Sequence, residues 1–156
     1  MAKSNQVIER DLGWKRIQRE IQAAKSASVR VGVLADAGTS DDGVDLVDIA
    51  VFNEFGTSRA PARPFIRGAF DEKQRDLTRL KARLWNQVLA GRLDTRRALG
   101  LLGQTHEDQI KVFMTELRTP ANEASTIAAK TRAGRKGDNP LIDTGRLRAS
   151  IRWTHD

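Results

Sequence analysis

The sequence predicts an α+β fold, with a small, mostly antiparallel sheet packed against long helices. Two long stretches repeat apolar residues every three or four positions, which is the spacing of one helix face. A short stretch, residues 29–35, alternates valine with Arg30 and Gly32, as a strand with one buried face does. The chain has 156 residues and no internal repeat, so we expect residues 1–156 to form a single domain.

Three elements are expected before the long helices. Residues 8–25 read as an amphipathic helix, with a stripe of apolar residues from Leu12 to Ala24. Residues 29–35 form the strand, and a turn rich in aspartate and glycine follows. Residues 44–56 form a short helix that ends at Gly56.

The long helices are expected to form an antiparallel hairpin over about residues 64–117. Pro64 suits the first position of the first helix, which runs to about residue 90. Gly91 breaks the pattern, and Asp94 is placed to cap the second helix. A short break between two long helices predicts that they pack side by side in opposite directions.

The C-terminal region is expected to hold shorter elements. Ser125 is placed to cap a brief helix, and a basic, glycine-containing loop covers residues 133–139. In the C-terminal segment, residues 140–156, Asp143 or Thr144 caps one or two helical turns. Residues 151–153 then return as an edge strand.

The composition restricts the location and the chemistry of the protein. There is no cysteine, which excludes disulfides, thiolate metal sites and cysteine nucleophiles, and this fits synthesis in a reducing cytoplasm. The N-terminal region has no apolar run of the signal-peptide type. No stretch approaches the roughly 20 apolar residues of a membrane span, so no membrane partner is expected.

The charge is basic and unevenly distributed. The net charge is +7, which favours contact with polyanions or acidic protein surfaces. Residues 36–48 hold five aspartates and no base, whereas lysine and arginine dominate residues 130–152. This pattern predicts an acidic edge and a basic edge, which suits head-to-tail packing of identical subunits. Ordinary solvated charge is the alternative interpretation.

The residues typical of catalysis and metal binding are sparse. His106 lies on an apolar stripe, as a core histidine does, and His155 is next to the terminus. The aspartates fail the EF-hand spacing, because the twelfth position counted from Asp36 is Val47. The basic loop lacks P-loop spacing, and no dinucleotide fingerprint is present. We therefore expect no enzymatic activity, no cofactor and no metal.

The stretch "VFNEFGTSRAPARPFIRGAF", residues 51–70, concentrates four of the five phenylalanines and two of the four prolines. Phe52 and Phe55 are three apart on a helix, so both can face one side. Pro61 and Pro64 stiffen the exit from that helix. Three arginines follow along this rigid segment, which suits a protein interface: Arg59, Arg63 and Arg67. The alternative is a tight loop that only docks the long helix.

The sequence "IAVFNEFGTSRAPARPFIRGAF" resembles the segment that marks the phage tail-completion family, also described as head–tail joining, neck, minor tail or virion morphogenesis proteins. Members show an Asn-Glu-Phe-Gly-Thr run, then Pro-Ala-Arg-Pro-Phe, then a long helix. A second piece, "NPLIDTGRLRASI", is similar to the family's Asp-Thr-Gly-Arg-Leu segment, and the strand "VRVGVL" precedes the first motif. The matching positions are Asn53, Glu54, Phe55, Gly56, Pro61, Arg63, Pro64, Phe65, Asp143, Thr144, Gly145, Arg146 and Leu147.

The resemblance implies a structural role in the virion. It implies a ring, commonly a hexamer, that binds the tail tube or its terminator on one side and the head connector or stopper on the other. Genomic DNA would pass through the lumen with weak, non-specific contact. The candidate interface residues also include Phe52, Arg59, Arg67, Arg135 and Lys136.

The resemblance leaves open whether the matching residues serve subunit packing or the internal fold, and an ion pair between Arg63 and Glu54 is one possibility. We also expect alanine at both Phe55 and Arg63 to leave folded subunits that cannot join heads to tails. Two other functions stay open: a tail-tube terminator, and a basic DNA-binding protein acting in packaging or regulation.

Overall fold

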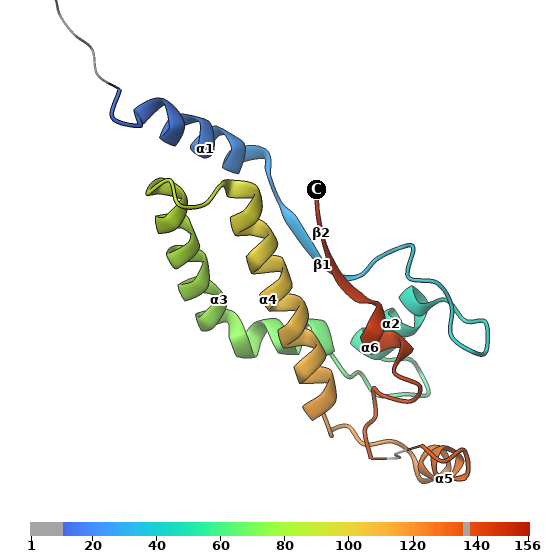
Figure 1. Ribbon diagram of the computed structural model, residues 1–156. Helices are drawn as coiled ribbons and strands as arrows, with labels where there is room; N and C mark the ends of the chain where they lie inside the picture. The colour runs from blue at the N-terminus through green and yellow to red at the C-terminus, as the bar shows by residue number, and fades with distance from the viewer. Residues whose placement is uncertain (1–10, 136–137) are drawn as a thin grey trace, which may run out of the picture.

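The computed structural model describes residues 11–135 and 138–156. Within these residues the architecture is α+β, with six helices and a two-stranded antiparallel sheet (Figure 1). The elements in chain order are α1 Trp14–Ser26, β1 Val29–Val33, α2 Leu46–Phe55, α3 Phe65–Leu89, α4 Thr95–Glu116, α5 Ala124–Arg132, α6 Arg146–Ser150 and β2 Ile151–His155. None of the described helices is both long and apolar enough to cross a membrane.

The sheet joins two strands that are distant in the sequence. β1 pairs with β2 in a register that places Val31 opposite Trp153 and Val33 opposite Ile151. Both predicted strands are confirmed, although β1 ends two residues earlier than expected. It ends at Val33 because its partner strand begins at Ile151.

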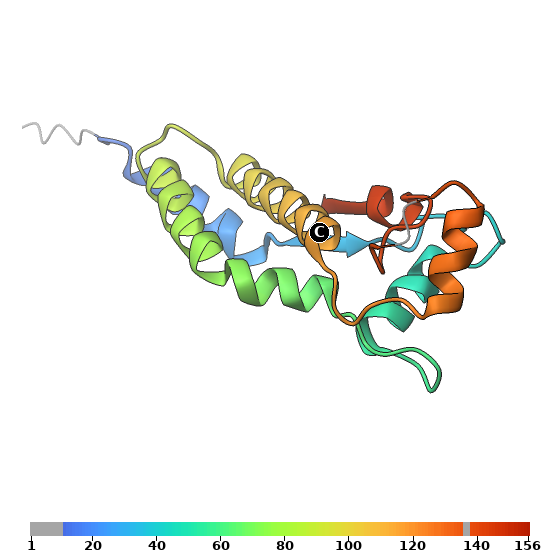
Figure 2. The same cartoon turned by 90° about the horizontal axis from the view of Figure 1, so that it is seen from below.

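The two long helices pack against each other, and α4 also contacts both strands (Figure 2). Glycine makes the close approach between α4 and the sheet possible. A Cβ atom on Gly103 would lie 2.7 Å from Cγ2 of Val29 and 3.1 Å from Cβ of Trp153. At Gly103, α4 therefore meets the sheet without an intervening side chain.

Replacing Gly103 by alanine is expected to lower the free energy of unfolding by about 1–3 kcal/mol, because the added methyl group forces α4 away from the sheet. Alanine would gain in helix propensity, so a purely local effect would have the opposite sign. The measurement is urea unfolding, with Gln104→Ala on the exposed side of the same helix as the control. Equal unfolding midpoints for the two variants would contradict this packing.

The main hydrophobic core lies where α2, α3, α4, α6 and β2 meet. Its fully buried members include Phe65, Ile110, Met114 and Ile151. A smaller cluster around Val88 joins α3 and α4 near the turn between them. The main core therefore fixes the start of α3, the end of α4 and the C-terminal segment relative to one another.

α1 differs from its prediction in extent and in packing. The part of the predicted helix at residues 8–10 lies outside the described residues. The helix begins at Trp14, because Gly13 has a left-handed φ of 105° and Asp11 accepts hydrogen bonds from the backbone N–H groups of Gly13 and Trp14. No residue of α1 is buried, so the predicted apolar stripe is not part of the core.

Helix caps were predicted with mixed success. Asp94 caps α4 by accepting from the N–H of Arg97, and Gly56 follows α2 with a φ of 77°, as expected. Pro64 is the residue before α3 and not its first helical position. Ser125 does not cap α5, because that helix already begins at Ala124.

The caps predicted for α6 are also wrong. Gly145 precedes the helix with a left-handed φ of 83°, and neither Asp143 nor Thr144 caps it. Both residues lie earlier in the turn than the capping position.

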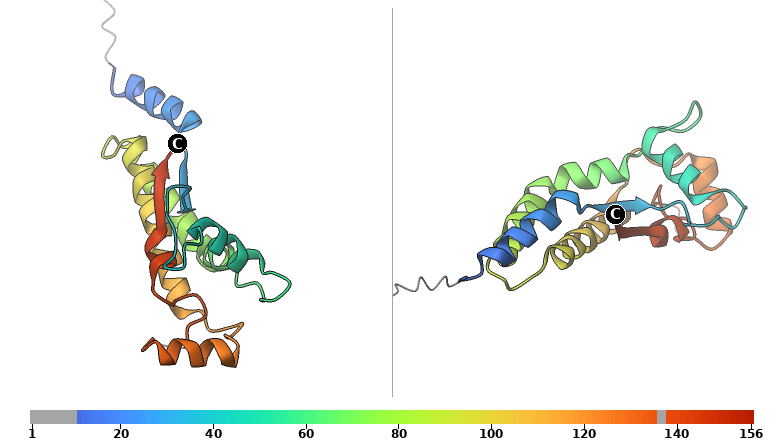
Figure 3. Two further views of the ribbon diagram at one scale, coloured as in Figure 1. Left: turned by 90° about the vertical axis from the view of Figure 1, so that its right-hand side faces the viewer. Right: turned by 90° about the horizontal axis from the view of Figure 1, so that it is seen from above.

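The molecule is elongated (Figures 2 and 3). α1 and the turn between α3 and α4 form one end. α2, α5 and the loop before α6 form the other end. Most of the candidate residues lie at this second end.

Candidate functional site

Glu54 lies inside the corner, which we define as residues 51–67. The residue is 6% exposed. One carboxylate oxygen, Oε2, accepts from the backbone N–H of Ile66 at 3.0 Å, and Oε1 accepts from that of Arg67 at 3.1 Å. Because the first N–H groups of a helix have no acceptor within it, Glu54 of α2 caps α3.

Arg63 is also buried and binds backbone carbonyls. Its Nε donates to the carbonyl oxygen of Pro120 and its Nη2 to that of Ala121, both at 2.8 Å. The suggested ion pair between Arg63 and Glu54 is wrong. Glu54 pairs with Arg67 at 3.0 Å, because Arg67 lies within the first turn of α3 that Glu54 caps, whereas Arg63 precedes the helix.

Backbone contacts complete the corner. The N–H of Arg63 donates to the carbonyl oxygen of Asn53 at 2.6 Å, so the loop returns to α2. A Cβ atom on Gly56 would lie 2.8 Å from the backbone nitrogen of Ala62, which only glycine tolerates. Phe65 is fully buried in the main core. These residues therefore hold the chain in its turn.

Other corner residues face outward. Val51 is 45%, Phe52 50% and Phe55 65% exposed, and we call these three the α2 stripe. The guanidinium of Arg67 lies 5.1 Å from the centre of the Phe55 ring. Arg59 and Pro61 are exposed in the loop, and Pro64 is partly buried.

Phe55 and Arg63 therefore differ in their surroundings, since Phe55 is exposed and Arg63 is buried. We expected alanine at both positions to leave folded subunits, but the burial of Arg63 argues against that outcome for its half of the double substitution. Phe55 alone can be removed without opening the core. Of these two residues, only Phe55 therefore remains a candidate for contact with a partner.

The second motif also divides into internal and outward positions. Leu147 is buried in the main core. Arg146 donates to the carbonyl oxygen of Thr39 at 2.9 Å and pairs with Asp41 at 2.9 Å. Asp143 pairs with Arg135 at 2.5 Å.

Of the remaining positions in this region, Thr144 is exposed, and Gly145 supplies the turn before α6. Lys136, and with it part of the predicted basic loop, lies outside the described residues.

The acidic and basic segments meet within one chain. Besides the contact of Arg146 with Asp41, Arg152 pairs with Asp36 at 2.5 Å. The prediction of separate acidic and basic edges is therefore wrong for these residues. β2 pairs with β1 and so brings the C-terminal arginines beside the acidic loop that follows β1. Because the two segments are far apart in the sequence, the sequence alone did not indicate this contact.

The two motifs share one groove of about 490 Å³ at this end of the molecule. Asn53 of the first motif lines it, as does the whole run from Asp143 to Leu147 of the second. Side chains of the acidic loop and of α5 form the other walls. The fold thus brings both motifs to one place, although about 90 residues separate them in the sequence.

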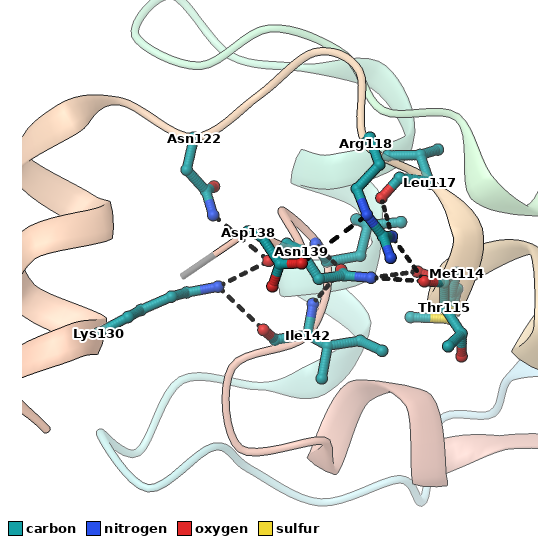
Figure 4. Close-up of polar contacts among 10 residues, drawn as sticks. Met114, Thr115, Leu117, Arg118, Asn122, Lys130, Asp138, Asn139 and Ile142 are labelled. Carbon is teal, nitrogen blue, oxygen red and sulfur yellow. Dashed lines mark hydrogen bonds and ion pairs between the residues drawn. The ribbon is translucent and has the colours of Figure 1, made fainter. Parts of the chain in front are cut away.

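A buried amide that the sequence did not single out fixes this region (Figure 4). Nδ2 of Asn139 donates to the carbonyl oxygens of Met114 and Thr115, each at 3.0 Å. Its Oδ1 accepts from the N–H groups of Leu141 and Ile142 at 2.8 and 2.9 Å. Asn139 therefore ties the last turn of α4 to the C-terminal segment.

Lys130 adds a second tie. Its Nζ donates to the carbonyl oxygens of Asn139 and Ile142, both at 2.9 Å, and so fastens α5 to the same segment (Figure 4). Burial lowers the pKa of Lys130, since its charge is removed from water. An asparagine in a turn, as Asn139 is, commonly bonds to nearby backbone groups, and the sequence can indicate that local role. The carbonyl groups that Asn139 reaches at the end of α4 are distant in the sequence, so only the fold reveals them.

Within the residues that the structure describes, no group of three or more histidine, cysteine, aspartate or glutamate side chains is placed to hold a metal ion. His106 packs edge-on against Phe70, with ring centres 5.8 Å apart. Burial lowers the pKa of His106, so the folded protein favours the neutral ring.

The free energy of unfolding is therefore expected to fall as the pH is lowered from the ordinary histidine pKa of 6.5 to the lowered value in the fold. In that window the unfolded chain binds more protons than the folded chain. Replacing His106 by glutamine should flatten this part of the profile. Urea unfolding at about pH 7.5 and about pH 5.5 measures it, and an equally steep fall in the variant would refute this assignment.

The described residues define a small α+β protein in which several buried polar side chains hold distant segments together. No protein-family model matches the chain, and no curated protein and no solved structure is significantly similar to it. The interpretation of its function therefore depends on the two motifs and on how the fold places them.

Proposed function

We propose that this protein is a non-enzymatic structural component of a phage virion neck that forms a homo-oligomeric ring and joins the tail to the head connector. The observation that carries the proposal is that Asn53 of the first motif and residues 143–147 of the second line one groove at one end of the molecule. Two separate motifs that build one surface behave as parts of a single functional unit.

The arrangement of polar groups supports a structural role. The buried charges at this end, Glu54, Arg63 and Lys130, all bind backbone groups of other segments. Their chemistry is used to fix the fold.

The proposed partners are those that the resemblance implies. The ring, a hexamer by analogy, would contact the tail tube or its terminator on one face and the connector or stopper on the other. Genomic DNA would pass through its lumen with weak, non-specific contact. The α2 stripe is an exposed apolar surface at the end that carries both motifs, and such surfaces typically mark protein contacts.

A regulatory DNA-binding protein is the main competing function. Ion pairs argue against it, because Arg135, Arg146 and Arg152 of the basic segment each pair with an aspartate. These arginines are less available for phosphate groups than the sequence implies.

The first experiment measures binding to duplex DNA across a range of salt concentrations. The neck protein should bind weakly at physiological salt. Nanomolar affinity with a steep salt dependence would favour the DNA-binding function.

The second experiment is quantitative mass spectrometry of purified phage particles together with co-purification. The proposal predicts the chain in mature particles in a small fixed copy number. Recovery with tube proteins alone would favour a tail-tube terminator, and absence from particles would overturn the proposal.

A further inference from the structure

α1 is held to the rest of the molecule by polar side chains. Arg16 donates to the carbonyl oxygens of Val88 and Leu89 at 2.8 and 2.7 Å. The carboxylate of Glu20 accepts from the N–H and the hydroxyl of Thr95 at 2.9 and 2.7 Å. The side of α1 that docks is thus polar, in contrast to an ordinary amphipathic surface helix.

The apolar residues of α1 are left at the surface. Trp14 is 62% and Ile21 38% exposed. Ala24 and Ala27, further along, border a groove of about 440 Å³ between α1, α3 and α4. We call this the helical groove.

The helical groove is apolar with a basic edge. Its walls are formed mainly by small and apolar side chains, including those of Trp85, Leu99 and Leu102. Lys81 lines the groove and is exposed, and the exposed Lys25 lies in the last turn of α1. A fitting occupant would be apolar with acidic groups beside it.

The α2 stripe has these properties. Val51, Phe52 and Phe55 are exposed, and the exposed Asp45 and Asp48 lie at the N-terminal end of the same helix. α2 lies at one end of the elongated molecule, and α1 with the turn between α3 and α4 lies at the other (Figures 2 and 3). Because the helical groove is lined by α1, α3 and α4, one copy cannot bring its own stripe into its own groove. A second copy can.

We infer that the α2 stripe of one copy occupies the helical groove of the next. The contact joins two different surfaces, so repeated use of it closes into a ring or continues as a filament. The acidic start of α2 would face Lys81 and Lys25. The inference rests on the proposed ring and names the surfaces that close it.

The test uses one variant for each surface. Phe52→Ser with Phe55→Ser removes the stripe, and Ala82→Glu places a bulky acid at an exposed position in the groove wall. Matched controls are Val112→Ser, another exposed apolar side chain, and Ala128→Glu on the exposed side of α5. Circular dichroism checks that all variants fold.

Sedimentation across a concentration series should show assembly for the wild type and both controls. Self-association of each surface variant should weaken by about tenfold or more. The decisive sample is an equal mixture of the two surface variants. Each supplies the surface that the other lacks, so the mixture should form a heterodimer and nothing larger.

The outcomes separate the contact from the function. Assembly that survives both surface variants, a mixture that stays monomeric, or a wild type that is monomeric throughout overturns the contact. If the contact fails but the protein is present in phage particles, the proposed function still stands. If the protein self-assembles through the contact but is absent from particles, the contact stands and the proposed function is overturned.

Discussion

Replacing Asn139 by alanine is expected to lower the free energy of unfolding by about 3 kcal/mol. The substitution removes the amide nitrogen, which donates to the carbonyl oxygens of Met114 and Thr115 at the end of α4, and the amide oxygen, which accepts from the N–H groups of Leu141 and Ile142. Because part of this region is buried, water cannot replace all four hydrogen bonds. Urea unfolding followed by circular dichroism measures the change.

Two further variants make this prediction specific. Asn139→Asp keeps the acceptors but turns a carboxylate toward two carbonyl oxygens, so it should destabilise at least as much as alanine. Asn86→Ala, at an exposed position of α3, should change the stability by less than about 0.5 kcal/mol. Near-wild-type stability of Asn139→Asp would contradict the donor role of the amide.

Replacing Glu54 by alanine is expected to lower the free energy of unfolding by about 2–4 kcal/mol. The loss leaves the N–H groups of Ile66 and Arg67 without their acceptor at the start of α3. Glu54→Gln keeps an acceptor oxygen and should cause a smaller loss. Thermal and urea unfolding of both variants give the comparison.

Arg67→Ala is the control for the ion pair. The Arg67 side chain is 59% exposed, so loss of its pair with Glu54 should lower the stability by no more than about 1 kcal/mol. If Arg67→Ala were as damaging as Glu54→Ala, the effect would come from the ion pair and the capping role of Glu54 would be wrong.

Local signals predicted much of the secondary structure. Asp94 and Gly56 act through neighbours within a few residues, so the sequence alone predicted their roles at helix ends. The alternation in residues 29–33 likewise depends only on the side-chain geometry of a strand. The α+β class followed from these local patterns.

Long-range partners were beyond the reach of the same reasoning. Periodicity showed that α1 has an apolar side, but not that Arg16 and Glu20 would dock the helix by its polar side. Arg63 and Glu54 were near each other in the sequence, yet each binds a different segment. Such choices depend on the tertiary arrangement, which no local pattern encodes.

For the candidate residues, too, local sequence patterns were informative and long-range contacts were not predictable. The fold brings Asn53 of the first motif and residues 143–147 of the second to one groove, and its role as the functional region stays a prediction. The motifs did not distinguish Glu54, which is internal, from Phe55, which is exposed. Asn139 lies inside the quoted second motif, but its role became clear only from the carbonyl groups that it meets at the end of α4.

Native mass spectrometry of the purified protein tests the central claim most directly, namely that a rigid corner exists to present a surface for assembly with further copies. The account predicts a single closed oligomer of one defined subunit number at micromolar concentration, lost when Phe52 and Phe55 are replaced by serine. A protein that stays monomeric at every concentration, or an oligomer indifferent to that change, would contradict it.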